Sequence, residues 1–303
     1  MRLFSRREPI IDPSRYQPPL PLPAGYTRAQ ILDALLSVSI DGSAIGELRG
    51  YATADCERFI HTLALVPPEA EGRLLEIGAN PYFTTLLLRR FRPALERSLV
   101  NFFGDAAGDA CQTVTFRNFD GEDDEAPFSY INLNIEAAPL PYPDAHFDIV
   151  LFCEVLEHMT GDPLRALLEL KRVLKPGGTM VLTTPNAARL ENVVAFLEGR
   201  NMYDPYSGYG PYGRHNREYT RHELHLLMTH AGFTVETSYT ANVYANVGAT
   251  AAPPGDINRL LSHVPGREHD LGQYLVTRWR NDEAANRGLP RWLYRSYPED
   301  AFA

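Results

Sequence analysis

The 303-residue chain has few cysteines and no excess of positive charge. Cys56, Cys111 and Cys153 are far apart and form no CxxC pair, which argues against a structural zinc cluster and favours a reducing compartment. Lys and Arg number 29 against 38 Asp and Glu, and a formal net charge of −9 disfavours broad binding to nucleic acid or anionic membranes. No apolar run approaches the roughly 18 residues of a membrane span, and the N-terminus lacks an apolar leader. We therefore expect a cytoplasmic protein that does not insert into membranes.

Hydrophobic residues make up 44% of the chain, enough for a sizeable core. Composition predicts an extended Pro-rich arm over residues 1–24, a helical cap over 25–70, an α/β core over 71–280 and an aromatic tail over 281–303 that packs on the core. Within the core, residues 187–216 interrupt the regular pattern and read as an insertion.

The stretch LLEIGAN, residues 74–80, organises the rest of the core. Its apolar residues Leu74, Leu75 and Ile77 are typical of a buried parallel strand, and Gly78 permits a sharp turn. Asn80 and Pro81 then fit the N-cap and first residue of a helix. A strand, a Gly turn and a helix start predict a nucleotide-binding crevice at the end of the strand, although a plain tight turn has the same signature.

The rest of the core alternates between segments with the hydrophobic pattern of a strand and segments with that of a helix. Alternating strands and helices predict a doubly wound α/β fold with a parallel sheet and right-handed crossovers. Helices are expected from Thr27, over 53–65, from Asp162 and from Thr220. The expected strands cover 98–103, a hairpin within 111–136, then 147–153, 179–184, 233–241 and 271–279.

Four ordered motifs carry a family resemblance: LLEIGAN (74–80), LPYPDAHFDIVLFCEVLEH (140–158), LKRVLKPGGTMVLTTPN (170–186) and REYTRHELHLLMTHAGF (217–233). On this set the chain resembles the class I S-adenosylmethionine-dependent methyltransferases. The resemblance implies a Rossmann-like, mostly parallel seven-stranded sheet with an antiparallel last hairpin, and S-adenosylmethionine as the cofactor.

The resemblance also assigns residues to the cofactor. Glu76, Gly78 and Ala79 occupy the motif that engages its methionyl end, and Asn80 stands where the family usually has another Gly. Cys153, at the end of the fourth expected strand, is expected to face the reaction centre.

The ribose and adenine contacts depart from the family pattern. Asn101, or alternatively Asp105, stands where an acid usually holds the ribose hydroxyls, and an amide lacks the charge-assisted strength of a carboxylate. Asn134, followed by Ile135, matches the acid that reads the adenine amine. Both asparagines are also compatible with ordinary strand ends.

Methyl transfer to a hydroxyl needs a base, or a metal ion that lowers the hydroxyl pKa. Glu154, Glu157 and His158 have the spacing of one helical face, and with His215 they match a site for Mg²⁺ or Mn²⁺. This layout is similar to that of metal-dependent small-RNA 2′-O-methyltransferases and of some ubiquinone-pathway O-methyltransferases. In the alternative, Glu157 only stabilises the helix and His158 acts as a base or lines the pocket.

The insertion carries Tyr203, Tyr206, Tyr209 and Tyr212, whose faces and hydroxyls suit sugars or flat polyketide-like rings; a packed loop is the alternative. Residues 206–220 and 270–276 resemble methyltransferases of bacterial polysaccharide and glycoside pathways. The first hypothesis is therefore O-methylation of a sugar, glycoside or other small natural product. The alternatives are a metal-dependent RNA 2′-O-methyltransferase and a non-catalytic methyltransferase-like protein that binds cofactor or a partner.

Overall fold

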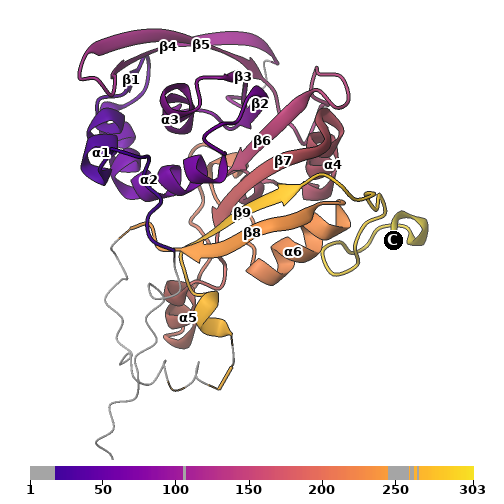
Figure 1. Cartoon of the computed structure of the whole chain (residues 1–303). Helices are drawn as coiled ribbons and strands as arrows, with labels where there is room; N and C mark the ends of the chain where they lie inside the picture. Colours follow the sequence, from indigo (N-terminus) through magenta and orange to yellow (C-terminus); the bar gives the residue numbers. More distant parts are fainter. Residues whose placement is uncertain (1–17, 105–106, 245–258, 260–262, 265) are drawn as a thin grey trace, which may run out of the picture.

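A computed structural model describes residues 18–104, 107–244, 259, 263–264 and 266–303. In this part of the chain, nine strands form one sheet in the order β1-β4-β5-β3-β2-β6-β7-β9-β8 (Figure 1). The strands are β1 (Ser39–Ile40), β2 (Gly72–Ile77), β3 (Leu95–Asn101), β4 (Gly108–Arg117), β5 (Asp123–Asn132), β6 (Phe147–Cys153), β7 (Leu174–Pro185), β8 (Thr234–Ala241) and β9 (Tyr274–Arg280). The helices are α1 (Arg28–Leu36), α2 (Ile45–Leu65), α3 (Phe83–Phe91), α4 (Pro163–Val173), α5 (Leu190–Leu197) and α6 (Arg221–His230).

The strands from β5 to β8 keep the order that the resemblance implies. Parallel pairs join β5 to β3, β3 to β2, β2 to β6 and β6 to β7, and β9 runs antiparallel between β7 and β8. The predicted doubly wound α/β fold is confirmed. The strands that follow β2 in the sequence, β3 to β5, lie on one side of it in the sheet, and the later strands β6 to β9 lie on the other side. This reversal between β2 and β6 opens a crevice at the carboxyl ends of the strands.

Two strands, β4 and β1, extend the sheet beyond the seven that the resemblance implies. The predicted hairpin forms as β4 and β5, and β5 pairs in parallel with β3. Its partner β4 therefore lies outside β5, and the short β1 covers part of β4 through Ser39 and Thr115. Covering an edge strand with a short neighbour limits the unpaired backbone that it exposes.

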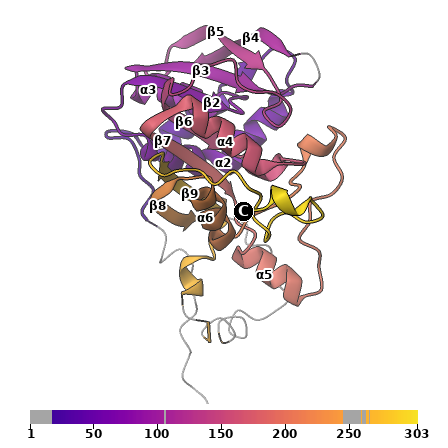
Figure 2. The same cartoon turned by 90° about the vertical axis from the view of Figure 1, so that its right-hand side faces the viewer.

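Helices cover both faces of the sheet (Figures 1 and 2). Along β2, Leu74 packs in the cluster formed with α1, α2 and α3, whereas Leu75 packs in the cluster formed with α4 and α6. The same alternation places Leu151 and Val150 of β6 in the two clusters in turn. Since successive side chains of a strand point to opposite faces, a strand buried on both faces needs the continuous apolar run seen in the sequence.

The helix starts follow their capping residues. Thr27 and Thr220 form capping boxes with Gln30 and Glu223 at the starts of α1 and α6, and Asp162 caps α4. Helix α2 begins at Ile45, eight residues before the predicted start at Thr53. Its first two turns contain two glycines, which lower helix propensity, but packing of this segment into the core outweighs that cost.

The C-terminal segment contacts the start of α4. The Tyr294 hydroxyl donates to Oδ1 of Asp162 at 2.6 Å and accepts from the N–H of Leu164 at 3.0 Å, and the ring is buried. The predicted arm falls outside the described residues over positions 1–17, as does Asp105. No helix among the residues described is both long enough and apolar enough to cross a lipid bilayer.

Candidate active site

The loop after β2 brings its backbone close to the end of β6. Gly78 has φ 73°, a left-handed conformation that favours glycine, and its N–H donates to the carbonyl of Val100 at 2.8 Å. A Cβ at this position would lie 2.7 Å from Cγ2 of Val155. Both the backbone conformation and the neighbouring side chain therefore require glycine here.

The prediction that Asn80 and Pro81 start the next helix is wrong. The Asn80–Pro81 bond is cis, and α3 begins at Phe83 after Tyr82, which adopts φ 69°. The N–H of Asn80 donates instead to Oδ1 of Asn101 at 2.8 Å. The loop is thus held by the end of β3 rather than by a helix cap.

A small cavity lies beside this loop. Glu76 is 5% exposed and accepts a hydrogen bond from Oγ1 of Thr85 at 2.6 Å, while burial raises the pKa of Glu76 to about 7. Burial likewise raises the pKa of the Cys153 thiol to about 12, so the thiol is not a nucleophile at neutral pH. The cavity is lined by Arg58 together with five of the expected cofactor residues: Glu76, Gly78, Ala79, Asn80 and Cys153.

Sequence reasoning missed Arg58. This side chain of α2 is 2% exposed, its Nε donates to Oδ1 of Asp55 at 2.9 Å, and its guanidinium lies 4.6 Å from the centroid of the Phe59 ring. The signal in the sequence was that Arg58, a charged residue, directly precedes Phe59 of the predicted apolar face of α2. The helical cap therefore contributes a buried cation to the crevice.

A second cavity continues from the first and shares Ile77 and Gly78 with it. Asn101 and Ile135 line it, and the amide of Asn101 also donates to the hydroxyl of Tyr82 at 3.1 Å. Asn101 is 3% exposed, and its hydrogen bonds to Asn80 and Tyr82 hold the loop after β2 in place. Its contact with a ribose remains a prediction.

Asn134 lies at the rim of the second cavity. Its Oδ1 accepts from the N–H of Glu136 at 2.9 Å, and its Nδ2 donates to the hydroxyl of Tyr212 at 2.8 Å. Tyr212 also lines this cavity, away from the other tyrosines of the insertion.

The two cavities fit the cofactor that the resemblance implies. One end holds a buried carboxyl and a guanidinium, which suit a zwitterionic amino-acid group, and the other has mainly apolar walls with amides, which suit a purine. The bare backbone at Gly78 joins them and leaves no room for a Cβ. Residues from the ends of β2, β3, β5 and β6 would thus hold S-adenosylmethionine.

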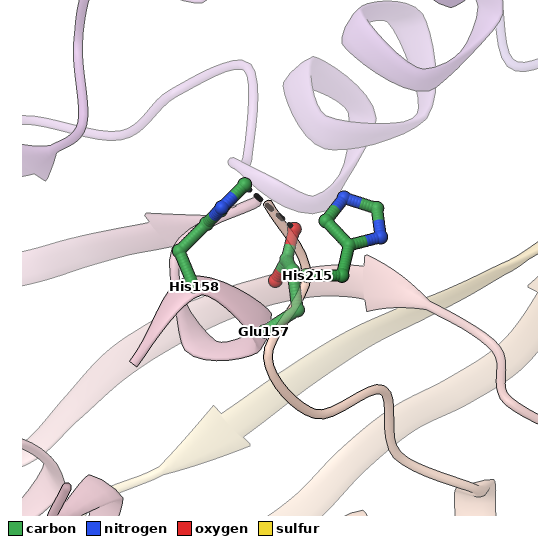
Figure 3. Close-up of side chains that lie close together, drawn as sticks. All are labelled: Glu157, His158 and His215. Carbon is green, nitrogen blue, oxygen red and sulfur yellow. Dashed lines mark ion pairs between the residues drawn. The ribbon is translucent and has the colours of Figure 1, made fainter. Parts of the chain in front are cut away.

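Beside this crevice, three predicted residues come together: Glu157, His158 and His215 (Figure 3). One possible ligand atom from each lies within 4.8 Å of the others. Nε2 of His158 is 3.9 Å from Oε1 of Glu157, and the two imidazole centroids are 5.0 Å apart. Glu157 has no exposed surface; its Oε2 accepts from Oγ1 of Thr184 at 2.9 Å, and Oε1 has no hydrogen-bond partner among the described residues.

Backbone and carboxylate groups orient the two imidazoles. Nδ1 of His158 is 3.0 Å from the carbonyl oxygen of Arg214; a carbonyl only accepts, so Nδ1 carries the hydrogen and neutral His158 keeps a lone pair on Nε2. Nδ1 of His215 is 3.0 Å from Oε1 of Glu218. Glu218, a second residue that sequence reasoning missed, holds His215 as carboxylates commonly hold metal-binding histidines.

The charges of the cluster follow from its burial. Burial lowers the pKa of His158, and the neighbouring His215 lowers it further. Burial also lowers the pKa of His215, but hydrogen bonding to Glu218 and the charges of Glu157 and Asp204 outweigh it and raise that pKa to about 9. Burial raises the pKa of Glu157. At neutral pH the site therefore combines a neutral His158 with a positively charged His215.

Glu154 does not join the cluster, contrary to the predicted shared face. Its φ of 54° turns the chain after β6, and the short 3₁₀ turn starts only at Leu156, so the helical spacing that was expected from Glu154 does not form. Its carboxyl instead accepts from Oγ1 of Thr183 at 2.9 Å and lies 4.0 Å from Nε of Arg58. Burial raises the pKa of Glu154 to about 8.

A third cavity lies on the insertion side of the cluster and is lined by His215, Glu218 and Tyr203 among others. Tyr203, Tyr206 and Tyr209 are 75%, 92% and 84% exposed, so the packed-loop alternative is wrong for these three rings. The cluster therefore stands between the crevice at the strand ends and an open, partly aromatic cavity.

The strand order, the Gly turn and the site at the strand ends define a class I methyltransferase fold. A sequence profile described as a methyltransferase domain matches residues 48–238, and the chain therefore belongs to this family.

Several curated proteins match over shorter stretches. A probable S-adenosylmethionine-dependent methyltransferase from Mycolicibacterium smegmatis is 36% identical over 112 residues, 37% of each chain. One from Mycobacterium tuberculosis is 35% identical over 97 residues, 32% of this chain and 30% of that protein. The ubiquinone/menaquinone biosynthesis C-methyltransferase of Shewanella frigidimarina is 39% identical over 79 residues, 26% of this chain and 28% of that enzyme. The matches thus span about a third of each relative.

Solved structures give weaker likenesses. A methyltransferase from Haloferax volcanii in complex with the Trm112 activator has a TM-score of 0.48 at 16% identity and covers 78% of this chain and 93% of that one. A SAM-dependent methyltransferase from Thermotoga maritima has a TM-score of 0.47 at 18% identity and covers 78% and 96%. The family assignment rests on the profile match rather than on these two structures.

Burial of Glu76 predicts a pH-dependent stability cost. The folded protein holds the Glu76 proton up to about pH 7, whereas an unfolded carboxyl releases it near pH 4.5. Between these two pH values unfolding therefore releases a proton, and the contribution of Glu76 to the free energy of unfolding falls as the pH rises. The free energy of unfolding of Glu76→Gln, measured relative to that of wild type, should therefore be higher at pH 8 than at pH 5. The difference between the two pH values should reach up to about 3 kcal/mol. Urea denaturation at both pH values measures the difference, with the exposed Glu71→Gln as control. An equal offset at both pH values would contradict this role of burial.

Proposed function

We propose that the protein is an S-adenosylmethionine-dependent methyltransferase that methylates a hydroxyl of a sugar, glycoside or other small natural product. The observation that carries the proposal is the position of the Glu157–His158–His215 cluster. His158 lines the cofactor-side cavity, and His215 lines the open cavity on the insertion side. Family membership and the names of the mycobacterial relatives support the cofactor.

When bound, S-adenosylmethionine supplies an electrophilic methyl group. The enzyme must then place an acceptor oxygen in line with that methyl group and remove its proton. His158 suits the second task because its Nε2 lone pair is free while Nδ1 is held by the carbonyl of Arg214. Its lowered pKa keeps the imidazole neutral, and hence basic, at neutral pH.

A divalent cation would serve the same end. Glu157, His158 and His215 offer a carboxylate and two imidazoles, and the unpartnered Oε1 of the buried Glu157 is an open ligand position among the described residues. Imidazole ligands favour Mn²⁺ over Mg²⁺. Such an ion would lower the pKa of a bound hydroxyl and replace the proton of His215 as the charge partner of Glu157.

The same cluster supports a second candidate, a metal-dependent RNA 2′-O-methyltransferase. The net charge of −9 counts against it because phosphate contacts dominate binding to RNA. Tyr203, whose exposed ring lines the open cavity, favours a sugar or aromatic acceptor.

The base role predicts a separation of binding from turnover. His158→Ala should leave the affinity for S-adenosylhomocysteine within about threefold of wild type while lowering kcat roughly 10²- to 10⁴-fold, since the proton acceptor is lost. Calorimetry measures the affinity, and methyl transfer to a panel of glycosides measures turnover. The exposed His222→Ala serves as the control. Wild-type turnover in His158→Ala would refute the role.

The metal role predicts direct binding of Mn²⁺. Calorimetric titration of the wild-type protein with Mn²⁺ alone should show one site, and His215→Ala should weaken it at least tenfold because one of three ligands is lost. His222→Ala should bind as wild type does. If wild type and His215→Ala bind Mn²⁺ equally, or neither binds, the metal site is wrong and His158 acts as the base alone.

A further inference from the structure

Tyr212 occupies a different environment from the other tyrosines of the insertion. It lies in the short 3₁₀ turn Pro211–Gly213, and its side chain lines the apolar end of the cofactor-side crevice. Its hydroxyl accepts from Nδ2 of Asn134 at 2.8 Å and from Oγ1 of Thr160 at 3.3 Å. Its ring meets Phe102 edge to face, with centroids 5.1 Å apart.

The turn that carries Tyr212 is hydrogen-bonded to the short 3₁₀ turn Leu156–His158 that follows β6. Nδ2 of Asn216 donates to the carbonyl of Pro211 at 2.7 Å and to that of His158 at 2.9 Å. The backbone N–H of Asn216 donates to the carbonyl of Glu157 at 2.7 Å. These bonds fix the turn relative to the strand ends, so the position of Tyr212 is set by the same residues that build the reaction site.

The cavity beside Tyr212 has the chemistry of a purine site. Phe102, Val155 and Leu133 supply mainly apolar walls, and Asn134 supplies a hydrogen-bonding amide at the rim. A flat heterocycle gains most from such a slot when an aromatic ring closes its open side. Tyr212, half-buried and facing this space, is placed to do so.

We propose that Tyr212 is a cofactor-binding residue that forms the outer wall of the adenosine end, so that the acceptor-side insertion also closes the cofactor pocket. The inference rests on the proposed function because it takes S-adenosylmethionine as the ligand. It separates Tyr212 from Tyr203, Tyr206 and Tyr209, whose exposed rings remain available to an acceptor.

Calorimetric titration with S-adenosylhomocysteine tests the proposal. Tyr212→Ala should bind at least tenfold more weakly than wild type, because stacking on an aromatic ring is worth on the order of tenfold or more per base. Tyr212→Phe keeps the ring and should stay within about threefold of wild type. Tyr209→Ala, an exposed tyrosine three residues away, should bind as wild type does. Equal or tighter binding by Tyr212→Ala would overturn the proposal, since Tyr212 would then be neutral or would block the site.

A second titration, with adenosine alone, tests which end of the cofactor Tyr212 contacts. If Tyr212 contacts only the adenosine end, as proposed, Tyr212→Ala should lose adenosine affinity by the same factor as it loses S-adenosylhomocysteine affinity. A loss confined to S-adenosylhomocysteine would contradict the placement. If wild type binds neither ligand, the proposed function fails together with this inference; if wild type binds and the variant matches it, this inference alone fails.

Discussion

The architecture of the site depends on one close approach, between Gly78 after β2 and Val155 after β6. A Cβ on Gly78 would lie 2.7 Å from the Val155 side chain, so the two strand ends come together only when one of them carries no side chain. The strand order of the sheet reverses between these same two strands, which is where a doubly wound sheet opens a crevice. The backbone at Gly78 therefore forms the junction of the two cavities that fit the cofactor.

A second constraint is the complete burial of Glu157. A buried carboxylate is costly unless hydrogen bonds and positive charge offset it, and here Thr184 and the imidazole of His215 offset part of that cost, while burial still raises the pKa of Glu157. Its backbone carbonyl meanwhile accepts the N–H groups of Asn216 and Arg217. The insertion that lines the open cavity is thus anchored on the reaction site itself, which links the acceptor side to the cofactor side.

The apolar runs and capping residues were sufficient to predict most strands and most helix starts, because these depend on local periodicity, whereas the order of the strands in the sheet came from the family resemblance. The sequence also predicted that His215 meets Glu157. It did not predict the left-handed turn at Glu154, which rests on tertiary contacts with Thr183 rather than on local propensity. Nor did it separate Tyr212 from the other tyrosines of the insertion, since tyrosines a few residues apart look alike until the turn that carries each is placed.

The central claim is that the row of cavities at the strand ends binds S-adenosylmethionine. Calorimetric titration of the wild-type protein with S-adenosylhomocysteine, in the presence of EDTA, tests it most directly. The account predicts saturable binding to one site per chain without added metal. Of the Glu157–His158–His215 cluster, only His158 is among the described residues that line the cofactor-side cavities. Absence of binding, with the protein folded, would contradict the account and favour a methyltransferase fold that serves another purpose.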